Sequence, residues 1–128
     1  MRLLLDTCVF IWLTSEPSRL SQPAIDALDS PANALFLSHA SIWEIYLKCG
    51  AGKLTLPTAP EPWIAEQLAA RQVAEQAIDL PSLSGTLKLP GHHRDPFDRL
   101  LIAQARTHSM TLVSPDPWIG KYDANLIW

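Results

Sequence analysis

Four acidic residues of this 128-residue chain lie in or beside apolar segments, where an unpaired charge is costly. Asp6 ends the run "RLLLD", Glu44 lies within "SIWEIYL", Asp98 follows "DPF", and Asp116 lies in "LVSPDPW". If these carboxylates converge, they repel one another unless they are protonated or bind a divalent cation. Oxygen ligands without cysteine favour Mg²⁺ or Mn²⁺, which can activate water to attack a phosphodiester bond. Convergence would therefore indicate metal-dependent phosphodiester hydrolysis.

Each acid also has a structural explanation. Asp95, which precedes a proline, is expected to be a helix N-cap. Glu44 stands three residues after Ser41, which is the spacing of a capping box, so a structural role stays open for it. Asp116 lies between two prolines and is compatible with a turn. Asp6 is harder to explain structurally, because an acid at the end of a buried apolar run needs a partner.

The pattern of apolar residues predicts strands that alternate with helices. Predicted strands span Arg2–Leu5, Ala34–Ser38, Glu75–Leu80, Met110–Ser114 and Ala124–Trp128. Predicted helices span Val9–Leu13, a segment starting near Ser21, Ser41–Gly50, Pro60–Val73, Ser82–Leu87 and Pro96 to about His108. This alternation predicts an α/β fold, a three-layer α/β/α sandwich with a central parallel sheet, formed by residues 1–128 as a single domain.

The predicted topology brings the four acids to one edge of the sheet. Ligands of such sheets bind beyond the carboxyl ends of the strands, where Asp6 and Asp116 follow two of them. Glu44 and Asp98 lie near the starts of helices that open at this edge. We therefore expect all four to be catalytic, with Asp6, Asp98 and Asp116 as the metal ligands.

The charge of the chain argues against one class of partner. A formal net charge of −3 does not fit a broad basic surface that grips duplex DNA. A local basic rim beside an acidic site is compatible with this net charge, and Arg94 and Arg99 are the candidate substrate-binding residues. Ordinary solvated side chains explain these arginines equally well.

Other features of the composition indicate a cytoplasmic protein. The apolar runs are too short to span a membrane, and we expect no membrane association. Cys8 and Cys49 are too few for a disulfide framework and lack metal-ligand spacing with the four histidines, so free thiols are expected.

The chain carries, in this order, the segments "LLLDTCVFIWL", "SIWEI", "HHRDPFDRLLIAQA" and "TLVSPDPWI" with a final "LIW". Together they resemble PIN-domain ribonucleases, specifically the VapC-like toxins of bacterial type II toxin–antitoxin pairs. The resemblance implies a PIN fold, a Mg²⁺ or Mn²⁺ centre, endonucleolytic cleavage of RNA and inhibition by a VapB-like antitoxin. By motif position, Asp6, Glu44, Asp98 and Asp116 correspond to the four acids of the family.

Three further residues are candidates for accessory roles. Ser114 stands two places before the fourth acid, where relatives more often carry Thr, and its hydroxyl can bind an acid or a water. Thr7 follows the first acid, and Asp95 is common in this branch of the family. Cys8 stands where relatives often carry His or Asn, and no role is assigned to it. Apolar helix surface in the N-terminal half would suit a homodimer or an antitoxin helix in a groove.

Three other classes of protein share parts of this pattern. A receiver-type phosphorelay domain has a similar fold but needs adjacent acids after its first strand and a lysine near its last. A haloacid-dehalogenase-like phosphatase needs a second Asp two residues after Asp6, where this chain has Cys8. A PIN-fold binding module without catalysis would keep the fold, although the presence of all four acids disfavours it.

Overall fold

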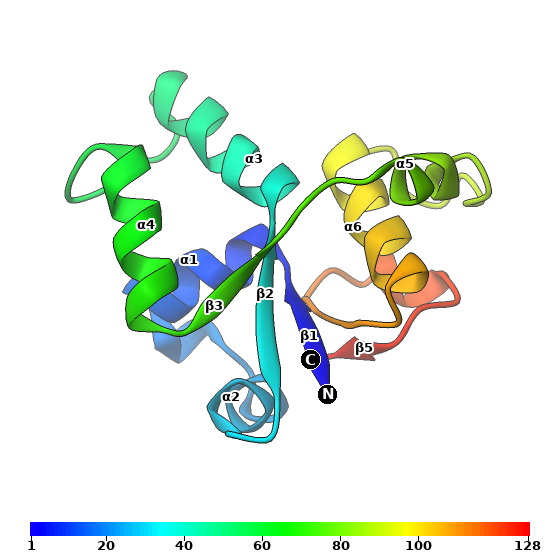
Figure 1. Ribbon diagram of the computed structural model, residues 1–128, viewed down its shortest axis with the longest axis horizontal. Coiled ribbons are helices and arrows are strands. Elements are labelled where there is room, and N and C mark those ends of the chain that lie inside the picture. Colours follow the sequence, from blue (N-terminus) through cyan, green and yellow to red (C-terminus); the bar gives the residue numbers. More distant parts are fainter.

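The computed structural model describes residues 1–128, and a parallel sheet forms its centre (Figure 1). The sheet has the spatial strand order β3-β2-β1-β4-β5, and every neighbouring pair of strands is parallel. The carboxyl ends of the strands therefore lie at one edge. The strands are β1 (Arg2–Leu5), β2 (Ala34–Ser38), β3 (Val73–Gln76), β4 (Thr111–Val113) and β5 (Leu126–Ile127).

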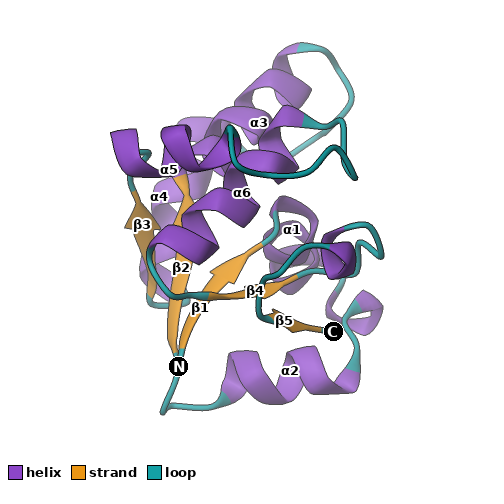
Figure 2. Ribbon diagram, turned by 90° about the vertical axis from the view of Figure 1, so that its right-hand side faces the viewer, coloured by secondary structure: helices purple, strands orange, loops and turns teal.

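Helices cover both faces of the sheet, as the predicted three-layer α/β/α sandwich requires (Figures 1 and 2). One core cluster joins β1 to residues of the first four helices, and a second joins β1 and β4 to α6. The helices are α1 (Thr7–Ser15), α2 (Gln22–Asp29), α3 (His39–Gly50), α4 (Pro60–Ala70), α5 (Leu80–Thr86) and α6 (Pro96–Thr107), with 3-10 turns η1 (Pro17–Arg19) and η2 (Ile119–Lys121).

The central strand β1 shows why a continuous apolar run forms this sheet. Side chains of a strand alternate between its two faces. Leu3 and Leu5 belong to the core cluster on one face, and Leu4 belongs to the cluster on the other. All three are fully buried, so the strand that precedes Asp6 has no solvent-exposed face.

The prediction was wrong about the junction between α4 and β3. The helix expected to reach Val73 ends at Ala70, and the strand expected at Glu75–Leu80 begins at Val73. Gln72 adopts a left-handed backbone conformation with φ 53°, which stops the helix, and Val73 is then buried in the sheet. The other predicted elements differ from the structure by small shifts at their ends.

The start of α3 also differs from the capping-box interpretation. The N-cap is Ser38, whose hydroxyl oxygen accepts a hydrogen bond from the backbone N–H of Ala40 at 3.0 Å. Ser41 lies inside the helix and is buried. Glu44 therefore lies in the second turn and does not close a capping box, so this structural explanation for Glu44 is wrong.

The strand order separates this fold from the receiver-type alternative. Receiver domains have the order 2-1-3-4-5, whereas here β1 lies between β2 and β4, as in the order 3-2-1-4-5. The receiver interpretation is therefore wrong. None of the helices combines the length and the apolar character that crossing a membrane would require.

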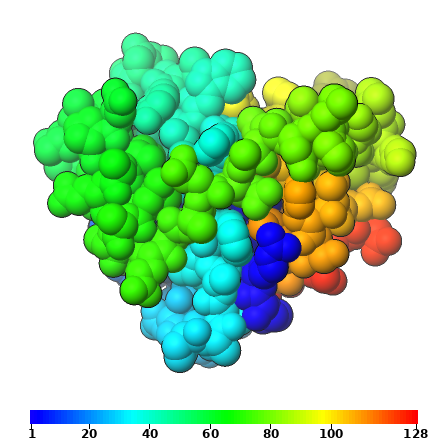
Figure 3. All heavy atoms as spheres, in the orientation of Figure 1, coloured from blue at the N-terminus to red at the C-terminus, as the bar shows by residue number.

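The surface between α3 and α4 is largely apolar. These helices form one flank of the face shown in Figure 3, and α5 and α6 form the opposite flank. A groove of about 450 Å³ is lined mainly by their apolar side chains, including Trp43, Tyr46 and Ile64. Trp43 is 58% exposed, so the groove presents an uncovered indole to solvent.

Candidate active site

Asp6 lies at the carboxyl end of the central strand β1, which pairs with β4. Its backbone N–H donates to the carbonyl of Val113 at 3.0 Å, which continues the pairing of the two strands. Asp6 is the N-cap residue of α1, yet its carboxylate makes no capping hydrogen bond. Instead, Oδ2 accepts a hydrogen bond from the Ser114 hydroxyl at 2.6 Å. The acid is thus held toward β4.

Burial raises the pKa of Asp6 above its usual value. The hydrogen bond from Ser114 acts in the opposite direction, and the negative charges of Glu44 and Asp116 raise the pKa further. A buried carboxylate near two other carboxylates is a place where a cation would be stabilised.

Glu44 approaches the same place from α3. Its Oε2 lies 3.0 Å from Nζ of Lys48, one turn later in the helix. The buried hydroxyl of Thr7 donates to the hydroxyl oxygen of Ser41 at 2.9 Å, which ties the start of α1 to α3. Thr7 therefore helps to position both the residue before it and the helix that carries Glu44.

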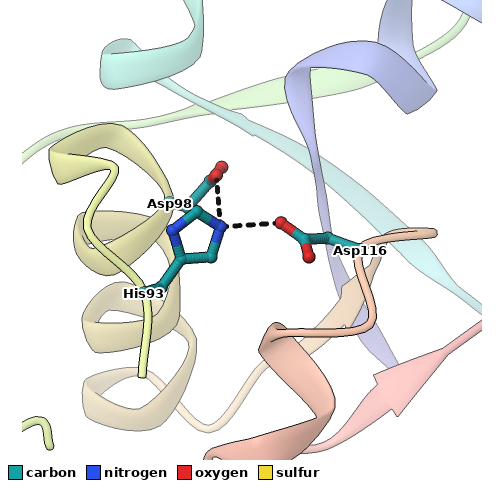
Figure 4. A group of neighbouring side chains, drawn as sticks. All are labelled: His93, Asp98 and Asp116. Atoms are coloured by element: carbon teal, nitrogen blue, oxygen red, sulfur yellow. Dashed lines mark hydrogen bonds and ion pairs between the residues drawn. The ribbon is translucent and has the colours of Figure 1, made fainter. Parts of the chain in front are cut away.

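Asp98 and Asp116 meet at a third side chain, that of His93 (Figure 4). Nε2 of His93 lies 3.0 Å from Oδ2 of Asp98 and 2.8 Å from Oδ2 of Asp116. Asp98 comes from the first turn of α6, Asp116 from the loop after β4, and His93 from the segment before α6. These three side chains offer ligand atoms within 4.8 Å of one another, and all are partly buried.

Burial, followed by the charge of Asp6, raises the pKa of Asp98 to about 7. Asp95 and Asp116 raise it further, and His93 lowers it. Asp6, Glu44, Asp98 and Asp116, hereafter the acidic cluster, thus act on one another electrostatically, although Asp6 and Glu44 lie outside the closest group. The convergence expected from the sequence is present.

Asp95 caps α6, as the sequence predicts. Its Oδ1 accepts hydrogen bonds from the backbone N–H groups of Phe97 at 2.8 Å and Asp98 at 3.5 Å. The backbone N–H of Asp95 in turn donates to Nδ1 of His93 at 3.1 Å. Asp95 therefore positions both Asp98 and the imidazole that bridges the acids.

This contact assigns the tautomer of His93. Because Nδ1 accepts a hydrogen bond, the ring hydrogen of the neutral imidazole is on Nε2, the atom that faces Asp98 and Asp116. A nitrogen that carries hydrogen cannot bind a metal ion. In this arrangement His93 is a hydrogen-bond donor to two carboxylates, occupying the position that a cation would take between them.

The two arginines predicted to bind substrate have different surroundings. The guanidinium of Arg99 donates to the carbonyl groups of Thr86, Leu89, Pro90 and His93 and to the hydroxyl of Tyr122. These contacts give Arg99 a structural role, since they tie the segment between α5 and α6 to η2. Arg94 is exposed and lines a hollow together with His93, whose imidazole contacts Asp98 and Asp116.

The chain matches a known domain family over nearly its whole length. The family described as "PIN domain" matches residues 3–125. The chain belongs to the PIN domain family. A curated relative, "Ribonuclease VapC22" of Mycobacterium tuberculosis (strain ATCC 25618 / H37Rv), is 33% identical over 121 residues, covering 88% of this chain and 85% of the relative.

Solved structures share the fold of this PIN domain. VapBC2 from Rickettsia felis, bound to a DNA fragment from its promoter, has a TM-score of 0.75 at 15% identity, with 98% of this chain and 97% of that chain covered. DNA-bound VapBC from Salmonella typhimurium has a TM-score of 0.70 at 16% identity, with 98% and 96% covered. Membership of the PIN family also excludes the phosphatase alternative.

Sequence reasoning missed His93 as a member of the PIN-domain site. The four histidines lack metal-ligand spacing with the two cysteines, and this comparison gives no indication of a role for His93. The signal was present in "HHRDPFD", where His93 comes two residues before the helix cap. A cap fixes the backbone on both sides of it, so a side chain two residues earlier can be held against the first turn.

The donor set fits a divalent cation that prefers oxygen ligands. The carboxylates of Asp98 and Asp116 already converge on one point, and Asp6 lies close behind them with an excess of negative charge. No cysteine belongs to the group of converging ligand atoms, and burial, with the charges of Asp6 and Asp98, raises the pKa of the Cys8 thiol to about 12. This composition favours Mg²⁺ or Mn²⁺ over softer metals.

Replacing Asp98 with Asn should change how stability depends on pH in metal-free protein. Because the pKa of Asp98 is raised to about 7 on folding, wild-type protein loses stability as pH rises from about 4 to 7. Asp98→Asn lacks this loss, so the free energy of unfolding of the variant minus that of wild type should increase from about pH 4 to pH 7. Denaturant unfolding in EDTA at pH 4.5 and 7.5 measures the difference.

The exposed Asp26→Asn replacement in α2 is the matched control, since it removes the same charge far from the acidic cluster. A difference between Asp98→Asn and wild type that did not vary with pH would contradict the raised pKa.

Replacing His93 with Ala should leave Mn²⁺ binding intact or tighten it by less than about tenfold. The imidazole N–H competes with a cation for Asp98 and Asp116, so its removal frees both carboxylates. Asp116→Asn should weaken binding by roughly 10-fold or more, because it removes a ligand. Calorimetric titration of Mn²⁺ compares the variants, and an equal loss in His93→Ala would show that His93 is itself a ligand.

Proposed function

We propose that this PIN-domain protein is a metal-dependent ribonuclease and the toxin of a type II toxin–antitoxin pair. The observation that carries the proposal is the meeting of Asp98 and Asp116 at one point beside the buried Asp6. The relative named "Ribonuclease VapC22" supports RNA as the substrate. The two free thiols, Cys8 and Cys49, support action in the reducing cytoplasm.

Asp6, Asp98 and Asp116 would hold Mg²⁺ or Mn²⁺. When bound, the ion lowers the pKa of a water molecule and neutralises charge on the phosphate. Ser114 orients Asp6 through its hydrogen bond, and its oxygen accepts the backbone N–H of Asp116 at 3.1 Å, so one hydroxyl positions two ligands. Glu44 is outside the closest group, and only its Oε2 is paired with Lys48, so Oε1 would be the atom that accepts a proton from the attacking water.

His93 has a second role in this mechanism. If Asp98 and Asp116 held a cation, the Nε2–H of His93 would be free to donate to another acceptor. The backbone N–H of Asp95 donates to Nδ1, which leaves Nε2 as the nitrogen that carries hydrogen and can donate. We infer that it donates to an oxygen of the phosphate bound at the same place.

Cleavage of single-stranded RNA should require added metal and Asp98. Protein treated with EDTA should cut a panel of single-stranded RNAs only after Mg²⁺ or Mn²⁺ is added. Asp98→Asn should lower the rate by about 100-fold or more, because an amide oxygen is a poor replacement for a carboxylate ligand. Asp95→Asn should retain most activity, since Asn is also a good N-cap.

Two outcomes would contradict this assignment. Robust cleavage in EDTA would exclude the metal mechanism, and wild-type turnover by Asp98→Asn would show that Asp98 is not a ligand. Protein that binds RNA but never cuts it with either metal would favour the non-catalytic binding module.

The antitoxin partner is supported by the apolar groove between α3 and α4. The structural neighbours include VapBC proteins and a "Toxin-antitoxin complex from Klebsiella pneumoniae". The groove suits the apolar face of an amphipathic helix around Trp43, and Glu61 at its edge suits a basic residue of that helix. We propose that a VapB-like antitoxin binds there and inhibits cleavage. A homodimer stays a prediction.

The product of a short open reading frame beside this gene should co-purify with the protein and suppress RNA cleavage. Trp43→Asp should weaken its binding by roughly 10-fold or more, because it places a charge among the apolar side chains that line the groove. Leu87→Asp is the control, since Leu87 is 86% exposed and lies outside the groove. If both variants bind alike in calorimetry, the partner does not use this groove.

A further inference from the structure

A second hollow adjoins the acidic cluster on the side of η2. It has a volume of about 320 Å³ and is lined by His92, His93, Arg94, Asp95 and Trp118. His93 belongs both to this hollow and to the meeting point of Asp98 and Asp116. Whatever occupies the hollow therefore lies next to the bond that the acidic cluster would cleave. We call it the Trp118 hollow.

Trp118 is an exposed aromatic side chain whose backbone is fixed. Its backbone N–H donates to Oδ1 of Asp116 at 2.9 Å, the same carboxylate whose Oδ2 contacts His93. Nζ of Lys121 lies 4.0 Å from the centre of the indole ring. The indole nevertheless remains 49% exposed. A rigid aromatic surface thus stands beside a proposed metal ligand with much of its area uncovered.

Positively charged side chains near the Trp118 hollow can offset the repulsion between the acidic cluster and a phosphate backbone. Four carboxylates repel a phosphate backbone, so a nucleic acid needs cations close by. Lys48 is paired with Glu44, and Arg99 is engaged with backbone carbonyls. Arg94 and Lys121 are exposed, and both border the indole or its hollow. Positive charge is therefore available on this side of the acidic cluster.

We propose that the Trp118 hollow binds the base of a nucleotide next to the cleaved bond, with the base stacked on the indole and a phosphate of the same strand contacting Arg94. This inference rests on the proposed ribonuclease function and adds a substrate subsite to it. Single-stranded RNA exposes the flat faces of its bases, and proteins that bind it combine aromatic stacking surfaces with cations.

His92 and Asp95 complete the walls of the subsite without competing for the indole. The imidazole of His92 packs edge-on against Tyr122, with the ring centres 5.2 Å apart. The carboxylate of Asp95 is occupied by the backbone N–H groups at the start of α6. Neither side chain stacks on Trp118, so its uncovered area is available to a planar ligand. Stacking accepts any base, so this subsite positions the strand more than it selects a sequence.

The test uses substrates that lack one base. The cleavage position of wild-type protein is first mapped on a single-stranded RNA. Two further substrates are then made, each with a base-free ribose on one side of the cleaved bond. For one of them, kcat/KM of wild-type protein should fall by roughly 5- to 150-fold, the range expected for loss of one base–aromatic stack.

Trp118→Leu should show a similar loss on intact RNA and no further loss on that base-free substrate, because the stacking surface is already gone. Trp118→Phe, which keeps a stacking surface, should retain most of the wild-type activity and the sensitivity to base removal. Trp128→Leu is the matched control: Trp128 is 37% exposed and packs on Trp12 of α1, away from the hollow. It should respond to base removal as wild type does.

If base removal lowers kcat/KM of Trp118→Leu by the same factor as it lowers that of wild type, the proposal is overturned. Unchanged RNA kinetics in Trp118→Leu together with weaker antitoxin binding would also overturn it, since the hollow would then be a protein contact.

A binding measurement separates this proposal from the ribonuclease assignment. In an Asp98→Asn background, where the RNA stays intact, the intact oligonucleotide should quench tryptophan fluorescence more than the base-free one. Because the chain has five tryptophans, this difference is assigned to Trp118 by its loss when Trp118→Leu is added. If wild type cuts no RNA but this difference is found, the subsite stands and the proposed reaction fails. Equal binding of both oligonucleotides, with or without Trp118, would overturn the subsite.

Discussion

The four carboxylates at the carboxyl ends of the strands repel one another, and the side chains around them are arranged to offset this repulsion. Asp6 is buried, and the pKa values of Asp6 and Asp98 are both raised, so the fold holds these acids where their charges are unfavourable. Ser114 donates to Asp6, Lys48 pairs with Glu44, and His93 donates to the remaining two acids. Each carboxylate thus has one partner that partly offsets its burial.

The strand order explains why these acids meet without any of them being adjacent in sequence. β1 and β4 are neighbours at the centre of the sheet, so the residues that follow them, Asp6 and Asp116, emerge side by side. The helices α3 and α6 contact each other and bring Glu44 and Asp98 to the same edge. A single exchange of strand positions would separate the acids, and for this reason the topology, more than any local motif, determines the site.

Much of the site was predictable because buried strands and acids have clear sequence signals. The apolar run before Asp6 fits a strand buried on both faces better than a half-exposed one, and Asp95 before Pro96 has the chemistry of a helix cap. Residues whose role depends on long-range contacts were less predictable. Arg99 has the sequence context of a substrate-binding arginine, but its partners are carbonyl groups that only the folded chain brings together. Similarly, Ser38 and Ser41 are equally good caps by residue type, and the end of β2 decides between them.

The positive charge around the acidic cluster is distributed unevenly, because long-range contacts decide which basic side chains are paired. On the side of α3, the charge of Lys48 is taken up by Glu44, so little positive charge is left for a phosphate. On the side of η2, Arg94 and Lys121 are exposed beside Trp118, and Asp116 links this side to the acidic cluster through the backbone of Trp118. A bound strand would thus be repelled by the acids unless a cation is present, and attracted only on one side. Metal binding and substrate binding are then coupled, because neutralising the carboxylates removes the repulsion that opposes the RNA.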